Sequence, residues 1–258
     1  MNIGIFDSGL CGLSVYTEVR KLLPHEDLTY FADQARVPYG TRPKPEIQRF
    51  SSEISDFLVK QGSTTAIMIA CNTISATSYD LLANAHPTIK FFEPLNFSIK
   101  QAAAASKKAI GVIATQGTVD SGVFERGIKA INPTIPVHQV ACPKFVTLVE
   151  EGKTSGPGVL AAAKEYLEPI SEHIDTLILG CTHFPFLADV IKEVLGNTIT
   201  LVNPAQSMAQ SVKEHLQNLG QLKQDGIGKD ILYTSGDTKR FKELSYMFIQ
   251  KEGDVRKA

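Results

Sequence analysis

Two short apolar segments of the chain share one pattern. Residues 65–70 and 175–180 are rich in aliphatic side chains, and each segment is followed by a cysteine and two polar residues. Such runs are too short for a core helix and are typical of buried parallel strands. We therefore expect Cys71 and Cys181 at strand-to-helix turns, where open α/β sheets bind ligands and helix N-termini attract anions.

The similarity extends to the segments that precede these strands. Residues 2–7 and 109–114 are both short apolar runs with glycine at the third position, Gly4 and Gly111. The distance along the chain from each glycine to its cysteine is also similar, from 4 to 71 and from 111 to 181. A repeat on this scale predicts a duplicated α/β unit.

The remaining periodicity predicts an alternation of strands and helices. Further strands are expected at residues 27–32, 89–92, 137–140 and 231–234. Helices are expected at 13–23, 45–61, 76–85, 159–174 and 207–219, and a final helix is expected to fray into a charged tail. Residues 115–121 form a polar segment that predicts a turn. Alternating elements of this kind indicate the α/β class with mostly parallel sheets.

Composition excludes several classes of function. The 258 residues are 43% hydrophobic, enough for a substantial core, and the formal net charge is −1. Lys and Arg are scattered, so no electrostatic footprint for nucleic acid is present. No apolar stretch approaches the roughly 20 residues of a membrane helix, and a strand rather than a basic leader opens the chain. We expect a cytoplasmic protein that binds neither nucleic acid nor membrane.

The four cysteines, at positions 11, 71, 142 and 181, are isolated from one another and are expected to be free thiols. Cys181 and His183 supply only two of the four ligands of a structural zinc site, so no metal is expected. Cys142 precedes a proline in an apolar setting, which favours a packed, inert thiol. The loop at residues 9–12 lacks the spacing of a dinucleotide fingerprint, so no cofactor is expected.

Each candidate residue also has an ordinary structural explanation. Asp7 or Ser8, directly after a strand, would often cap a turn. A single cysteine is usually a small core residue, and a single histidine is usually structural. Two cysteines placed equivalently and followed by polar residues favour a catalytic site instead.

The chain resembles glutamate racemases of the cofactor-independent aspartate/glutamate racemase superfamily. The matching segments occur in the order of the family, at residues 5–9, 30–40, 70–73, 93–94, 141–143, 149–152 and 179–185. The resemblance implies two similar α/β domains related by a pseudo-two-fold axis, with the active site in the cleft between them. The first domain would comprise residues 1–95 and 208–258, and the second would comprise residues 96–207.

The implied activity is racemisation of L-glutamate to D-glutamate, without cofactor or metal, for peptidoglycan synthesis. Inverting an α-carbon requires one group that removes a proton and another that delivers a proton to the opposite face. A free thiol is only about 3% thiolate at pH 7, so each cysteine needs neighbours that assist it. The resemblance assigns Asp7 to Cys71, and Glu150 and His183 to Cys181. The substrate-binding residues that it implies are Asp7, Ser8, Tyr39, Gly40, Asn72, Thr73, Thr182 and His183.

Three positions depart from the pattern of the family. Cys11 replaces a glycine, Leu95 follows the Glu-Pro pair in place of glycine, and Asn203 replaces an acidic residue. These changes concern the geometry of the loop, regulation by bound ligands and the substrate preference rather than the reaction type. The alternatives to a glutamate racemase are an aspartate racemase, another amino-acid or hydantoin racemase, and a non-catalytic two-domain ligand-binding protein. A thiol hydrolase or transferase would leave the second thiol unexplained. The resemblance also implies a homodimer.

Overall fold

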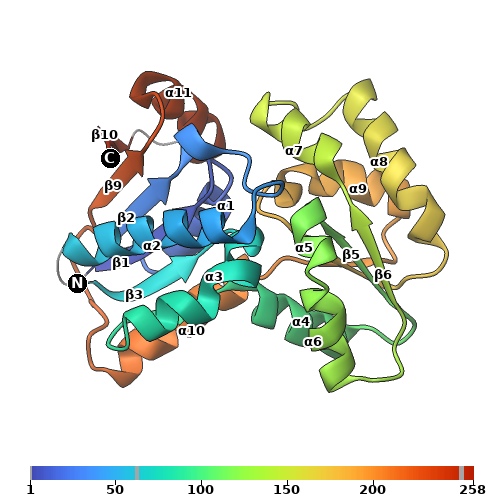
Figure 1. The fold of residues 1–258 in the computed structure, drawn as a ribbon, viewed down its shortest axis with the longest axis horizontal. Helices are drawn as coiled ribbons and strands as arrows, with labels where there is room; N and C mark the ends of the chain where they lie inside the picture. The colour runs from blue at the N-terminus through green and yellow to red at the C-terminus, as the bar shows by residue number, and fades with distance from the viewer. Residues whose placement is uncertain (1, 62–63, 250–252) are drawn as a thin grey trace. The chain divides into compact units, whose positions relative to one another are not determined.

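The computed structural model describes residues 2–61, 64–249 and 253–258. The chain forms two compact units, Met1–Pro94 with Ala205–Ala258, and Leu95–Pro204. Each unit is built on its own parallel sheet, which confirms the predicted α/β class. Figure 1 follows the chain through both units.

The sheet of the first unit has six parallel strands in the order β10-β9-β2-β1-β3-β4. The strands are β1 (Asn2–Asp7), β2 (Asp27–Ala32), β3 (Thr64–Ile69), β4 (Lys90–Phe92), β9 (Asp230–Thr234) and β10 (Asp254–Lys257). Figure 1 shows β9, which comes late in the chain, beside β2. The last segment of this unit therefore completes a sheet that the first segment begins.

Helices cover both faces of this sheet. They are α1 (Leu13–Leu22), α2 (Lys44–Lys60), α3 (Asn72–Ala85), α10 (Ala205–Asn218) and α11 (Thr238–Ile249), with a short 3₁₀ helix η1 (Gln34–Arg36). Successive side chains of a strand point to opposite faces. Tyr30 of β2 accordingly packs on Tyr16 of α1, and Phe31 packs on Phe57 of α2.

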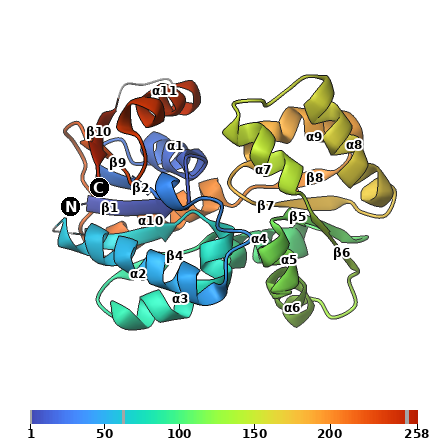
Figure 2. The ribbon, with the colours of Figure 1, turned by 45° about the horizontal axis from the view of Figure 1, so that its top comes forward.

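The second unit has four parallel strands in the order β6-β5-β7-β8. The strands are β5 (Ile110–Ala114), β6 (Val137–Ala141), β7 (Thr176–Gly180) and β8 (Thr200–Val202). Its helices are α4 (Pro94–Ala105), α5 (Gln116–Asp120), α6 (Val123–Ile131), α7 (Pro143–Glu150), α8 (Pro157–Ser171), the 3₁₀ helix η2 (Phe184–Leu187) and α9 (Ala188–Leu195). Figure 2 shows α5 and α6 on one side of this sheet and α8 and α9 on the other.

The two sheets share one topology. The order β6-β5-β7-β8 repeats the order β2-β1-β3-β4 of the first unit, to which β9 and β10 are added. In each sheet the second strand in sequence lies on one side of the first strand, and the next two strands lie on its other side. The strand order therefore switches between β1 and β3 in the first unit and between β5 and β7 in the second. Parallel α/β sheets bind ligands at the carboxyl ends of the strands at such a switch point. Cys71 follows β3 and Cys181 follows β7, so the two thiols occupy equivalent topological positions.

Three local expectations are wrong. Residues 115–121 contain helix α5 rather than a simple turn, because the side chain of Thr115 accepts a hydrogen bond from the amide of Thr118. Helix α3 begins at Asn72, earlier than residue 76. The charged tail includes strand β10, which pairs with β9, while residues 250–252 of that tail lie outside the described residues.

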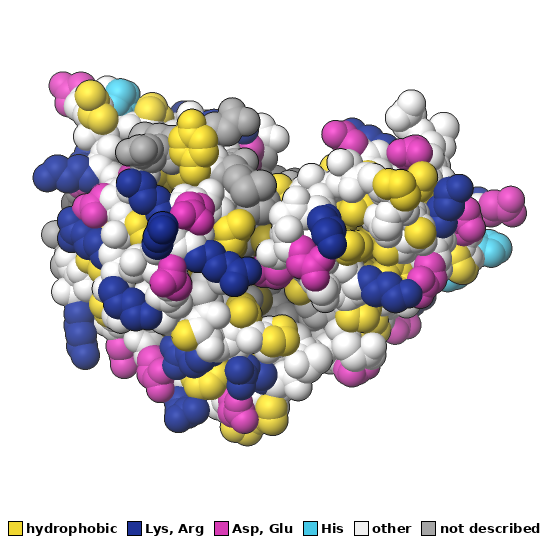
Figure 3. Space-filling view, turned by 90° about the horizontal axis from the view of Figure 1, so that it is seen from above, with side chains coloured by type: hydrophobic (Ala, Val, Ile, Leu, Met, Phe, Trp, Pro, Cys, Tyr) yellow, Lys and Arg dark blue, Asp and Glu magenta, His cyan; other side chains and the backbone are white. Residues whose placement is uncertain are grey.

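The surface carries charges of both signs. On the face drawn in Figure 3, Lys and Arg side chains are interspersed with Asp and Glu rather than gathered in a stripe.

In the part of the chain that the structure describes, no helix has the length and apolar character needed to cross a membrane.

Candidate active site

Cys71 lies at the junction of β3 and α3. Its backbone is extended, with φ −71° and ψ 120°, and it occupies the N-cap position of the helix. Its carbonyl accepts hydrogen bonds from the amide of Ser75 at 3.0 Å and from Ser75 Oγ at 2.9 Å. Cys71 therefore lies at the N-terminus of α3, and a helix N-terminus stabilises negative charge placed there.

The neighbouring strand β1 supplies polar groups to the same edge of the sheet. The Cys71 thiol donates to Ser8 Oγ at 3.7 Å. Asp7 is fully buried at the end of β1, and its Oδ2 accepts a hydrogen bond from the amide of Gly9 at 3.1 Å. Strands β1 and β3 are paired, so Asp7 and Cys71 leave the sheet from adjacent positions.

The loop after Asp7 packs so closely against Asp7 and Tyr30 that position 12 has no room for a side chain. A Cβ atom there would lie 2.5 Å from Asp7 Cβ and 2.7 Å from Tyr30 Oη. Cys11, which departs from the family pattern, is fully buried, and its carbonyl accepts from the amide of Ser14 at 3.0 Å. The glycine that this loop requires sterically is thus Gly12, which is present.

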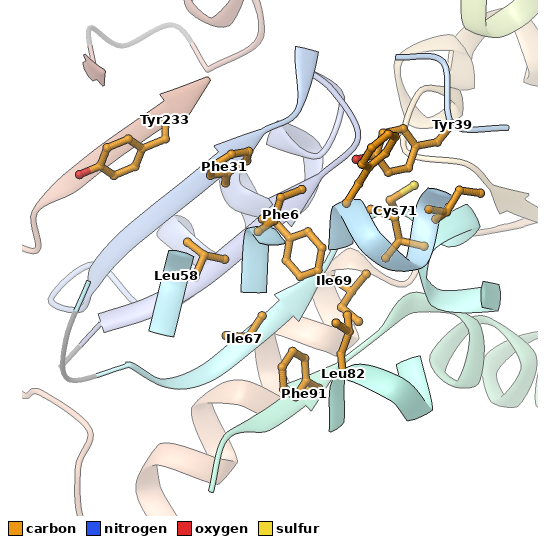
Figure 4. Close-up of a cluster of buried hydrophobic side chains, with 14 residues drawn as sticks. Phe6, Phe31, Tyr39, Leu58, Ile67, Ile69, Cys71, Leu82, Phe91 and Tyr233 are labelled. Atoms are coloured by element: carbon orange, nitrogen blue, oxygen red, sulfur yellow. The ribbon is translucent and has the colours of Figure 1, made fainter. Parts of the chain in front are cut away.

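Tyr39 is held beside Cys71 by a buried carboxylate. Both residues belong to the apolar cluster of Figure 4, which shows them near one another at one end of it. The Tyr39 hydroxyl donates to Asp33, which also accepts from Arg36 Nε at 2.6 Å and from Ser235 Oγ at 2.6 Å. Burial, and then the Asp33 carboxylate, raise the pKa of Tyr39 far above its usual value. Tyr39 therefore stays a neutral hydroxyl.

Asn72 and Thr73 form the start of α3, directly after the thiol. Both are buried, and nothing in the described part of the chain hydrogen-bonds to the buried Oδ1 of Asn72. A buried amide oxygen without a partner is costly, so this atom is suited to accept a hydrogen bond from a ligand. Gly40 follows Tyr39 and is partly buried.

In the second unit, Cys181 begins a chain of three interacting side chains. Cys181 Sγ lies 3.3 Å from His183 Nδ1, and His183 Nε2 lies 2.8 Å from Glu150 Oε1. The thiol and the imidazole are buried, while the Glu150 side chain is 27% exposed. The acid comes from the last residue of α7, and the other two residues follow β7.

The carboxylate determines which nitrogen of His183 carries the proton. An ionised carboxylate can only accept, so Nε2 donates to Glu150 and Nδ1 of the neutral ring is left as the acceptor that faces Cys181. The thiol can then pass its proton to Nδ1. The product is a thiolate beside an imidazolium, which Glu150 stabilises through a charge-assisted hydrogen bond.

Aromatic packing holds these elements together within the unit. Phe145 of α7 packs edge-on against Phe184, which follows His183, with ring centroids 5.5 Å apart. A Cβ at Gly180 would lie 2.7 Å from the carbonyl of Ile113, so only glycine allows this approach of β7 to β5. Thr182, which separates Cys181 from His183 in the sequence, is also buried.

Cys142 is a second thiol in this unit with a different environment. It is fully buried, and its Sγ donates to the carbonyl of Val140 at 3.6 Å. Burial, assisted by the nearby Cys181, raises the pKa of Cys142 well above the usual thiol range. Cys142 is packed in the core, as the sequence predicts.

The predicted site residues thus form two groups. Asp7, Ser8, Tyr39, Asn72 and Thr73 gather with Cys71 in the first unit, and Glu150, Thr182 and His183 gather with Cys181 in the second. Tyr30 and Asp33, which hold the loops of the first unit, lie in a matching sequence segment but have no predicted role. Ser235, which directly follows β9, donates to Asp33, and no local sequence signal indicates this contact.

Fold and site together define an α/β protein with two sheets of the same strand order, each with one thiol directly after an equivalent strand. The chain belongs to the Asp/Glu/hydantoin racemase family, whose profile matches residues 3–212.

Known proteins resemble this chain over nearly its whole length. Glutamate racemase 2 of Caldanaerobacter subterraneus subsp. tengcongensis is 41% identical over 98% of this chain and 94% of its own. The crystal structure of glutamate racemase from Francisella tularensis in complex with D-glutamate has a TM-score of 0.93 at 33% identity, covering 100% of this chain and 97% of that one. Aspartate racemase of Picrophilus torridus is similar in fold alone, with a TM-score of 0.62 at 15% identity over 86% of this chain and 96% of its own.

Proposed function

We propose that this chain is a glutamate racemase that moves the α-proton of glutamate with the thiols of Cys71 and Cys181. The observation that carries the assignment of both thiols is their equivalent position, each at the switch point of a sheet with the same strand order. Inversion at a carbon needs two acid–base groups of opposite role, and a duplicated fold supplies two.

The proton balance of the reaction requires no other reagent. One cysteine acts as thiolate and takes the α-proton, which leaves the bonding pair on the α-carbon. The other cysteine acts as thiol and donates its proton to the opposite face. Each turnover leaves the first sulfur protonated and the second ionised, so the protein is then set for the reverse direction. No electron is gained or lost.

At Cys181, the imidazole of His183 accepts and returns the proton of the thiol. His183 accepts the thiol proton at Nδ1 to form the thiolate and returns it when Cys181 must act as an acid. Glu150 keeps the ring in the required tautomer and stabilises its charged form. His183 and Glu150 therefore adjust the acid–base state of this thiol rather than act on it sterically.

At Cys71, the assisting groups are different. The amides at the start of α3 stabilise the thiolate, and the Ser8 hydroxyl lies within hydrogen-bonding reach of the sulfur. We assign Asp7, which ends the adjacent strand, as the carboxylate that assists proton transfer at this thiol. Its burial at the edge of the sheet supports the role.

Substrate binding is assigned to the polar groups next to the thiols. The unpartnered Oδ1 of Asn72 is suited to accept from the α-ammonium group of glutamate. Ser8, Thr73 and Thr182 supply hydroxyl groups, and Asp7 and His183 complete the set of polar contacts. Tyr39 contributes a neutral hydroxyl, and Gly40 follows it along the loop.

Glutamate is favoured over aspartate by the pattern of similarity. The glutamate racemase relatives cover almost the entire chain at about 40% identity, whereas the aspartate racemase shares the fold at 15%. The product, D-glutamate, would serve peptidoglycan synthesis in a bacterial cytoplasm, and the active form would be a homodimer. An aspartate or hydantoin racemase is the second candidate, because the family includes both.

The decisive experiment follows optical activity without added cofactor. Protein treated with a chelator and dialysed is incubated with L-glutamate and, separately, with D-glutamate in D₂O. We expect loss of optical rotation in both cases and incorporation of solvent deuterium at the α-carbon. A requirement for a metal or for pyridoxal phosphate, or faster turnover of aspartate, would contradict the proposal.

A further inference from the structure

The Tyr30 hydroxyl contacts the backbone of the loop that follows Asp7. Tyr30 belongs to β2, is fully buried, and pairs in register with Ile5 of β1. Its hydroxyl donates to the carbonyl of Gly9 at 2.7 Å and lies 3.5 Å from the carbonyl of Leu10. The ring thus spans from the core of the sheet to the backbone of the loop.

A second hydrogen bond links the same glycine to the catalytic carboxylate. The amide of Gly9 donates to Asp7 Oδ2 at 3.1 Å. Tyr30 holds the carbonyl side of Gly9, and Asp7 holds its amide side. Rotation of Gly9 is therefore restricted at its carbonyl by Tyr30 and at its amide by Asp7.

Packing leaves little room for the hydroxyl to move. A Cβ at Gly12 would come within 2.7 Å of Tyr30 Oη, so the loop backbone is in close contact with it. On its other side the Tyr30 ring packs against Tyr16, with centroids 6.2 Å apart at an interplanar angle of 70°. Packing of the Tyr30 ring in the core thus fixes the position of its hydroxyl, and the backbone of the loop packs closely against this hydroxyl.

We propose that Tyr30 is a positioning residue for proton transfer at Cys71, acting through Gly9 on Asp7. The inference rests on the proposed function, because it assumes that Asp7 assists this thiol. In this assignment Tyr30 acts through its hydrogen bond to the carbonyl of Gly9. It determines how a carboxylate is presented to the site.

The test compares two tyrosines of the same core. Tyr30→Phe keeps the ring and removes the hydroxyl from Gly9. Tyr16→Phe removes the hydroxyl of another buried tyrosine, which hydrogen-bonds to Asp230 rather than to the loop. Both variants are expected to lose some stability, which thermal unfolding measures, so stability alone does not separate them.

The readout is the α-deuterium isotope effect on kcat for each enantiomer. The enantiomers have equal free energy, so kcat/KM is the same in both directions for every variant. An asymmetry can therefore appear in isotope effects, or in kcat and KM together by the same factor, but not in their ratio. When transfer at Cys71 becomes the slow step, the enantiomer whose proton Cys71 removes shows a large effect. The other enantiomer shows a small effect, because its deuterium leaves in an earlier step.

We expect Tyr30→Phe to lower kcat on the order of tenfold, the factor for loss of one orienting hydrogen bond. Its isotope effects should be asymmetric in the same sense as those of Asp7→Asn, whereas Tyr16→Phe should match the wild type. Wild-type isotope effects in Tyr30→Phe, or an asymmetry of the same sense in Tyr16→Phe, would overturn the inference. Failure of the proposed function would be visible separately, as absence of racemisation by the wild type.

Discussion

His183 and Glu150 form a 2.8 Å hydrogen bond that joins the end of β7 to the last residue of α7. Glu150→Gln keeps the size of the side chain but removes the charge that stabilises the imidazolium. We expect kcat to fall about 10- to 100-fold, the range for a hydrogen bond to a charged group. Glu151→Gln is the matched control, because Glu151 is exposed and pairs with Lys153. Equal activity of the two variants in a racemisation assay would argue against a role of Glu150 in stabilising the His183 imidazolium.

Replacement of either catalytic thiol by alanine should abolish racemisation. One face of the α-carbon then lacks its acid or base, and general acid–base groups contribute about 10²- to 10⁴-fold. Cys142→Ala is the control, since that thiol is buried and has no assigned role. Circular dichroism of folded Cys71→Ala and Cys181→Ala protein with L- and D-glutamate measures the loss. Near-normal rates in either variant would defeat the two-thiol assignment.

Asp7→Asn and His183→Asn should slow different proton transfers. Each variant is expected to show unequal α-deuterium isotope effects on kcat for the two enantiomers, and the enantiomer with the large effect should differ between the variants. The reason is that Asp7 is assigned to Cys71, whereas His183 lies 3.3 Å from Cys181. Symmetric effects in both variants would indicate that the two residues only bind substrate.

The buried thiol of Cys142 should make stability fall at alkaline pH. Its pKa is raised by burial, so the unfolded chain releases this proton at about pH 8.5 while the folded protein retains it. The stabilisation is therefore complete below about pH 8.5 and decreases above it, by up to about 1.4 kcal/mol per pH unit. Urea unfolding from pH 7 to pH 10 should show a shallower decline for Cys142→Ala than for the wild type. Parallel declines would show that Cys142 ionises equally in both states.

Apolar runs predicted most of the fold because each buried strand is short and continuous. Strands β1 and β2 occupy the residues expected from sequence. Helix α5 was not predictable in this way, since its sequence includes Gly117 and its start depends on a threonine cap. Strand β10 is charged and largely exposed, and its pairing with β9 is a tertiary contact without an apolar signature.

The candidate site was predictable in part. Strand ends indicated both cysteines, but only resemblance to a family linked Glu150 to His183, which are 33 positions apart in the chain. The roles of Asp33 and Tyr30 became visible only with the structure, because each depends on backbone or side-chain partners from other strands. Ser235 contacts Asp33 across 202 positions, a separation at which sequence patterns carry no signal.

The discontinuity of the first unit has a consequence for synthesis on the ribosome. The second unit, Leu95–Pro204, is one continuous segment, so all of it emerges before any residue of α10, β9 or α11 is made. Until then the edge of β2 that later pairs with β9 is unpaired, and α1 lacks the helix α10 against which it packs. An unpaired strand edge can pair with another chain. The nascent protein therefore passes through a stage in which the later unit can be complete while the earlier one still awaits its last strands.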